Sequence, residues 1–228
     1  MPTNTTNQQI TIPIGTDGAD NPQAFIDQIA DVENRLVQRY TNLADRTARN
    51  PAPTQGELSI LNTSTWYDRY TGAKWLPVTP IQVFKTASAP NVNNSTALIN
   101  DPELVVPLPA ANTTYAVDAV IFYISGTTAD IKFTFAGPAG MTGTLGGIGL
   151  STASAGASGD GLFAAVGLPA TVAFGGAGAG AALTAHLSAT VVTVGTTGNL
   201  TLQWAQNALE VINTTVLLHS RLFVRPIS

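Results

Sequence analysis

The segment that decides the fold of this chain is 113-TTYAVDAVIFYISGTTADIKFTFA-136. In residues 131–136 apolar and polar side chains alternate, which is the period of a β-strand with one buried face. Residues 113–125 are apolar on both faces, because Tyr115 and Ile121 fall on one face and Phe122 on the other. Antiparallel strands commonly have one solvated face. We therefore expect a β-sandwich in which a neighbouring copy of the chain covers the second face of 113–125.

The sequence that follows this segment is almost free of charge. Between Gly137 and Ser220 the only acidic or basic residues are Asp160 and Glu210, and the whole chain is 11% charged, against a usual ~25%. Gly, Ser, Thr and Pro interrupt every apolar run before ~18 residues, so no membrane span is predicted. Leu, Val and Phe recur throughout, which argues against a disordered segment. The composition favours a β-domain that buries uncharged surface against copies of itself.

Further strands are predicted on both sides of the segment, and together they make one large domain over residues 82–228. Alternation and turn residues indicate two antiparallel sheets. The predicted strands of this domain are 81–86, 103–108, 113–125, 130–136, 145–150, 162–174, 183–194, 199–206 and 214–226.

The N-terminal part of the chain has a different character. Residues 1–21 are polar and predict an extended attachment arm, with a loose terminus as the alternative. Residues 22–49 predict the one helix of the protein, capped by Asn21. This helix either joins a bundle of copies or lies on its own domain. Its apolar seam is Phe25, Ile29, Val32, Leu36 and Leu43, and the interface residues expected are Ile29, Val32, Leu36, Leu43, Ile121 and Phe122.

Residues 50–81 predict a Pro-rich linker followed by a small β-meander with strands at 57–61, 65–70 and 74–78. Three of its aromatic residues, Trp66, Tyr70 and Trp75, are candidates for contact with a glycan or a partner. The alternative is that they form the miniature core of a unit too small to fold without one.

No catalytic, cofactor-binding or metal-ligating constellation is present in the sequence. His186 and His219 stand alone in predicted strands, cysteine is absent, and no lysine follows the glycine runs. The predicted β-domain has very few acidic residues from which a carboxylate pair for glycan cleavage, such as Asp118 with Asp130, could be formed. The ten basic residues are scattered and the net charge is −4, which argues against nucleic-acid binding. We expect a protein that is not an enzyme.

Two N-terminal stretches and the C-terminal strands resemble phage proteins. The stretch 9-QITIPIGTDGADNPQAFIDQIADVENRL-36 is similar to the start of tail-fibre, minor tail and head-fibre proteins of actinobacterial phages. Residues 43–76, which end in Tyr70, Gly72 and Trp75, resemble a second phage element. Residues 113–134 and 199–224 resemble trimeric jelly rolls of the tumour-necrosis-factor type.

This resemblance implies a homotrimeric surface appendage of the virion, made in the host bacterial cytoplasm and anchored to other virion proteins through residues 1–47. A tail-fibre or minor tail protein that contacts host cell-surface glycan is one form of this hypothesis. A capsid decoration or head-fibre protein is the alternative, favoured by the plain Gly/Ala-rich loops. A glycan-degrading enzyme is the third alternative. None of these expectations includes a cofactor, nucleic acid or membrane.

Overall fold

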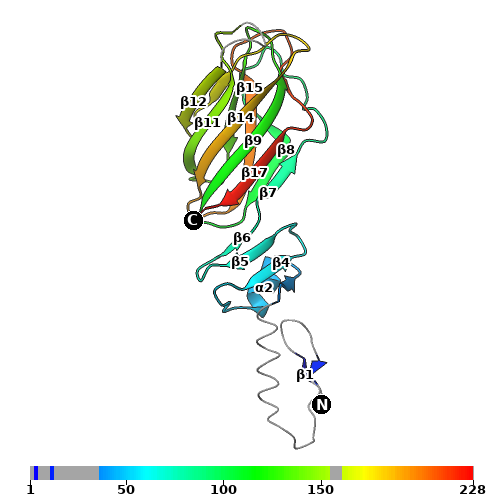
Figure 1. Ribbon diagram of the computed structural model, residues 1–228, viewed down its shortest axis with the longest axis vertical. Helices are drawn as coiled ribbons and strands as arrows, with labels where there is room; N and C mark the ends of the chain where they lie inside the picture. The colour runs from blue at the N-terminus through cyan, green and yellow to red at the C-terminus, as the bar shows by residue number, and fades with distance from the viewer. Residues whose placement is uncertain (1–2, 5–10, 13–35, 155–160, 228) are drawn as a thin grey trace, which may run out of the picture. The chain divides into compact units, whose positions relative to one another are not determined.

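The computed structural model describes residues 3–4, 11–12, 36–154 and 161–227. The chain divides into two compact units, Met1–Thr79 and Pro80–Ser228, where the sequence placed the boundary after residue 81. Figure 1 shows that β-strands dominate the second unit. The prediction of a mainly β protein with a β-sandwich is confirmed.

The second unit is a sandwich of two antiparallel sheets. The larger sheet has the order β12-β11-β14-β9-β17-β7, with β16 also paired to β9, and the smaller has the order β13-β10-β15-β8. The strand bounds are β7 Ile81–Phe84, β8 Ile99–Leu108, β9 Thr114–Ile124, β10 Ile131–Ala136, β11 Thr142–Leu150, β12 Gly161–Gly167, β13 Val172–Phe174, β14 Ala182–Val192, β15 Gly198–Gln206, β16 Thr215–Val216 and β17 Arg221–Pro226.

The pairing of these strands is that of a jelly roll. Without the β11–β12 hairpin and β16, eight strands remain, and the first pairs with the last: β7 with β17, β8 with β15, β9 with β14, and β10 with β13. The chain is thus one long hairpin rolled into two sheets, which is the jelly-roll arrangement. Successive pairs lie alternately in the larger and the smaller sheet, so each sheet is built from strands far apart in sequence.

The core is made by the inward face of every central strand. On β9 the side chains of Tyr115, Val117, Ala119, Ile121 and Tyr123 are at most 2% exposed. Facing residues of the smaller sheet include Phe133, Phe135 and Trp204, which are likewise buried. Burial at alternate positions matches the period-2 pattern of 131–136 and 200–204 in the sequence.

The hairpin of β11 and β12 is an addition that widens the larger sheet beside β14 (Figure 1). Its glycines let the sheet approach the ring of Phe174, because a Cβ placed on Gly149 would lie 2.6 Å from a ring atom of Phe174. A larger residue at this position would push the hairpin off the core.

Two predicted strands are each broken in the structure. Residues 162–174 form β12 and β13, which belong to different sheets, because Gly167 and Pro169 make a turn between them in which Ala170 N donates to Gly167 O. Residues 214–226 form β16 and β17, separated by a turn in which His219 has a positive φ of 68°. The prediction of His219 in a strand is therefore wrong.

The first unit contains a mixed sheet of order β3-β4-β5-β6, in which β3 pairs in parallel with β4 and the other pairs are antiparallel. β1 and β2 form a separate two-stranded ladder. The bounds are β1 Thr3–Asn4, β2 Thr11–Ile12, β3 Gln38–Tyr40, α2 Leu43–Arg49, β4 Leu58–Leu61, β5 Tyr67–Tyr70 and β6 Trp75–Pro77. The three strands predicted for the meander match β4, β5 and β6.

The helix predicted over 22–49 is wrong where the structure describes it before α2. Residues 38–40 form β3, which pairs in parallel with β4, and a new helix starts after Asn42. Asn42 has extended dihedral angles and its side chain accepts a hydrogen bond from Asp45 N, as an N-cap does. The remainder of the predicted helix, including Ile29 and Val32, and most of the predicted arm lie outside the described residues.

Candidate functional site

The outer face of the larger sheet is unusually poor in charge on one side. The strands β11, β12 and β14 contain 9, 7 and 11 residues and none of them is Asp, Glu, Lys or Arg. At the usual ~25% of charged residues, strands of this combined length would carry about six or seven charges. A sheet face in contact with water normally carries such charged residues. The composition of this face is therefore typical of a surface that another protein surface buries.

Large apolar side chains stand on this face in one row across the sheet. The strand registers place Phe163, Ile148, His186, Val120, Arg221 and Phe84 side by side on successive strands. Phe163 is 78% exposed, Phe84 63% and Ile148 50%. Cross-strand neighbours on one face act together as a packing surface. The row contains four apolar side chains, with one histidine and one arginine among them. We call it the outer row.

A shallow hollow of about 380 Å³ lies in the middle of the same face. Its lining includes Gly146, Ile148, His186, Ser188 and Asp118. The glycine leaves room above the sheet, and small polar side chains surround the apolar floor. Its lining also includes Arg221 and Phe223, so the hollow combines apolar surface with one acidic and one basic side chain.

The predicted interface residues fall in three different places. Ile121 is 0% exposed and faces the smaller sheet, so its assignment to an interface is wrong: it is a core residue of a single chain. Phe122 lies on the opposite, outer face and is half-buried, with Val120 and Ile124. Leu36 and Leu43 are 47% and 57% exposed in the first unit.

The three aromatic candidates of the first unit surround a buried ion pair. Arg46 Nη1 lies 2.7 Å from Asp68 Oδ2, and both side chains are less than 10% exposed. Trp66 Nε1 donates to Asp68 Oδ1 at 3.0 Å, and the Arg46 guanidinium lies 4.6 Å from the Trp75 ring centroid. Tyr70 and Trp75 have ring centroids 5.3 Å apart. These contacts give all three aromatic residues a structural role around a polar core.

Replacing Arg46 with Met should destabilise the first unit by about 3–5 kcal/mol, because it leaves the buried Asp68 carboxylate without its cation. Hydrogen exchange followed by mass spectrometry should show faster exchange in 36–79 and unchanged exchange in the jelly roll. The exposed Arg69 provides the matched control, since Arg69→Met should change stability by less than about 0.5 kcal/mol. Equal effects of the two substitutions would contradict this polar core.

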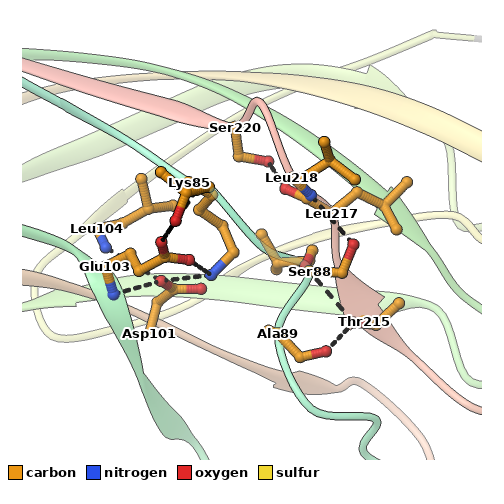
Figure 2. Close-up of polar contacts among 12 residues, drawn as sticks. Lys85, Ser88, Ala89, Asp101, Glu103, Leu104, Thr215, Leu217, Leu218 and Ser220 are labelled. Carbon is orange, nitrogen blue, oxygen red and sulfur yellow. Dashed lines mark hydrogen bonds and ion pairs between the residues drawn. The ribbon is translucent and has the colours of Figure 1, made fainter.

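A second buried ion cluster lies in the jelly roll, where β7 ends and β8 begins (Figure 2). Lys85 Nζ lies 2.9 Å from Asp101 Oδ1 and 3.2 Å from Glu103 Oε2. The side chains of Lys85 and Asp101 are 0% exposed, and that of Glu103 is 29% exposed. The register between β8 and β15 shifts here, so β8 bulges and brings Asp101 and Glu103 to the same lysine. The sequence analysis did not predict this cluster.

Hydrogen bonds from the Thr86 hydroxyl and backbone N–H, followed by the Lys85 ammonium, lower the pKa of Glu103 from 4.5 to about 2. A pKa lowered by folding adds stability above the unfolded value, and the addition is lost as the pH falls toward the folded value. The difference in melting temperature between the wild type and Glu103→Gln should therefore become smaller as the pH falls from 4.5 toward about 2. Burial raises the pKa of Asp130, so its titration changes stability in the opposite direction. This effect is the same in both proteins and leaves their difference unchanged. A constant difference between the two melting curves would refute this titration.

The remaining polar residues do not assemble a metal centre. No group of three or more His, Cys, Asp or Glu residues that could hold a metal ion occurs within the described part of the chain. His186 stands on the outer face of β14, and Asp118 is exposed on β9. Asp130 is buried in the β9–β10 loop, where its carboxylate accepts a hydrogen bond from Gly176 N at 3.0 Å. Among the described residues, no helix has the length and apolar character needed to cross a membrane.

Comparison with known proteins places this chain in no family. No family model matches the sequence, and no curated protein sequence matches it. The chain is weakly similar to a structure of the infectious bursal disease virus Gx strain, with 10% identity over 77% of this chain and 48% of that chain and a TM-score of 0.16. The VP2 subviral particle of the same virus gives 9% identity, 74% and 50% coverage and a TM-score of 0.16. The chain spans about half the length of these proteins, and at these TM-scores the likeness supports no conclusion about function.

Proposed function

We propose that this chain is a non-enzymatic structural protein of a phage virion, a homotrimeric surface appendage of the tail-fibre or minor tail type. Residues 1–47 attach it to other virion proteins, and its jelly roll projects from the particle. The observation that carries this proposal is the jelly roll with one uncharged, apolar outer face on β12, β11 and β14. The resemblance of residues 9–36 and 43–76 to phage proteins supports the assignment of the chain to a virion.

The self-association occurs through the outer row. A second copy of the chain is the partner that suits this face, because β11, β12 and β14 have no Asp, Glu, Lys or Arg with which a charged partner could pair. Apolar burial contributes roughly 25 cal/mol for each Å² removed from water, so even a ~1,000 Å² interface supplies roughly 25 kcal/mol before the entropy costs of association. Three copies rather than two follow from the resemblance to trimeric jelly rolls.

The capsid decoration or head-fibre role is the second candidate. The loop after β13 has the sequence GGAGAGA at 175–181 and contains no aromatic or charged side chain. Receptor-binding loops depend on aromatic and polar side chains for affinity, so a loop of this composition is better suited to a protein that reinforces a shell. In the tail-fibre role, glycan contact would fall to the edges of Trp66, Tyr70 and Trp75 that remain accessible.

The location on the particle distinguishes the two roles. Gold-labelled antibody against the purified chain should mark the tail of the phage that encodes it, seen by electron microscopy. Label spread over the head would establish the decoration role instead. Particles that bind no antibody, together with a purified chain that cleaves host cell-wall polysaccharide, would overturn both roles in favour of an enzyme.

A further inference from the structure

The Lys85 cluster has the geometry of a reactive site as well as that of an ion pair. Lys85 and Asp101 are fully buried, and their side chains meet at 2.9 Å between Nζ and Oδ1. The backbone of Lys85 is fixed on both sides, because its N–H donates to Ser220 O and its carbonyl accepts from His219 N. Two reacting groups held in the correct orientation can reach an effective concentration of ~10⁵–10⁸ M.

The two oxygens of the Asp101 carboxylate are treated differently by their surroundings. Oδ1 accepts hydrogen bonds from Glu103 N and Leu104 N, both at 3.0 Å, in addition to Lys85 Nζ. Oδ2 is buried, and among the described residues no donor reaches it. A buried carboxylate oxygen without a donor is costly. Backbone donors on Oδ1 are also what stabilises negative charge on a carbonyl oxygen under attack.

We propose that Lys85 and Asp101 become joined by an intramolecular isopeptide bond between Nζ and Cγ, with loss of Oδ2 as water. The Lys85 ammonium gives a proton to the Glu103 carboxylate, 3.2 Å away, and Glu103 passes it to Oδ2, which leaves an amine and a carboxylic acid. The Nζ lone pair attacks Cγ, and the negative charge forms on Oδ1. The nitrogen then loses a second proton, which travels to the Oδ2 hydroxyl. The C–Oδ2 bond breaks, water departs, and one hydrogen remains on the amide nitrogen.

Glu103 carries both protons from nitrogen to Oδ2, one before and one after the attack. Its Oε2 lies 3.2 Å from Lys85 Nζ, and its Oε1 accepts hydrogen bonds from Thr86 N and Oγ1, so its position is fixed. It enters the reaction as the carboxylate, the form that accepts a proton, and is restored when the proton moves to the leaving oxygen. Because Glu103 is 29% exposed, it also connects the site with solvent, toward which the water can leave.

The bond would join the two sheets at the point where the chain enters the jelly roll. β7 is an edge strand of the larger sheet and β8 is an edge strand of the smaller sheet. β7 follows directly on the first unit, whose end is Thr79. If the proposed function holds and the N-terminal part anchors the protein to a virion, pulling on the particle would peel β7 from β17. A covalent link from Lys85 to Asp101 stops that peeling within one strand.

The mass of the denatured full-length chain tests the bond directly. Electrospray mass spectrometry should give a value lower than that calculated from the sequence by one water, about 18 Da. Chymotrypsin cleavage after Leu98 separates residues 85 and 101 along the chain, so both should remain in one fragment only when the bond is present. A mass equal to the calculated value in the folded, aged protein overturns the proposal, whatever the oligomeric state or location of the chain.

Two variants locate the reaction. Lys85→Arg should have its full calculated mass, which also removes the alternative of water loss at Asp17-Gly18 or Asp160-Gly161, since both dipeptides remain in this variant. Glu103→Gln should keep the full mass for hours or longer because its proton carrier is gone. A mass deficit of one water in Lys85→Arg would overturn the bond. The same deficit in Glu103→Gln, with none in Lys85→Arg, would leave the bond in place and overturn the part assigned to Glu103.

Discussion

Ile121→Asp should prevent the jelly roll from folding. Ile121 is 0% exposed on β9, and its strand neighbour Ala185 on β14 is also buried. The substitution removes a packed aliphatic side chain, at about 2–5 kcal/mol, and leaves an unpaired carboxylate in an apolar interior, at several kcal/mol more. Domains have only about 5–15 kcal/mol of stability. The variant should lack a cooperative unfolding transition by circular dichroism in urea.

The comparison for this result is Phe163→Asp, on the outer face of the same sheet. Phe163 is 78% exposed in the single chain, so the fold should tolerate the carboxylate there. The pair therefore separates core from interface, which were not distinguished from the sequence. If the free energy of unfolding of Ile121→Asp lies within about 1 kcal/mol of the wild-type value, the inward direction of the Ile121 side chain is wrong.

Phe163→Asp should instead abolish self-association. In a trimer joined through the outer row, each copy would bury a carboxylate against an apolar face, with no Lys or Arg on β11, β12 or β14 to pair with it. Loss of an aromatic hot-spot contact costs about 2–4 kcal/mol at an interface, so association should weaken roughly 30- to 900-fold. The mass by light scattering should fall from three chains to one at micromolar concentration.

Val211→Asp is the matched control for this second substitution. Val211 is 74% exposed and lies between β15 and β16, outside the outer row. This variant should keep the mass of the wild type. A Phe163→Asp protein that still has the mass of three chains would show that the copies meet elsewhere, for example through residues 22–49.

The sequence predicted the sandwich well where burial alternates. Phe133, Phe135, Leu202 and Trp204 lie at every second position and are all buried, so the period of the pattern decided both strand and face. The face of Ile121 could not be decided, because both faces of β9 are apolar and only the register with β14 and β17 shows which one meets the smaller sheet. Alternation predicts two faces and does not say which is inside.

The breaks between elements were harder to predict. The strand predicted over 162–174 continued through Pro169, although proline cannot donate to a ladder and should have ended it. The turn at His219 left no such signal, because a non-glycine residue with positive φ is rare. The helix failed at 38–40 because Gln38 and Tyr40 are buried by pairing with β4, and this partner lies about 20 residues away in the chain.

The Lys85 cluster could have been found from the same period-2 pattern. Ile81, Val83 and Lys85 occupy alternate positions, so a strand that buries Ile81 must also turn its lysine inward. A buried lysine requires a carboxylate partner. The sequence does not reveal which one, because Asp101 and Glu103 reach Lys85 only through the bulge in β8.

The solution mass of the purified chain tests the central claim most directly, because the account requires copies of the chain to cover the outer row. Light scattering coupled to size exclusion should give three times the chain mass of 23.6 kDa, unchanged on dilution through the micromolar range. A single species of 23.6 kDa at every concentration would contradict the account and leave the outer row without a partner.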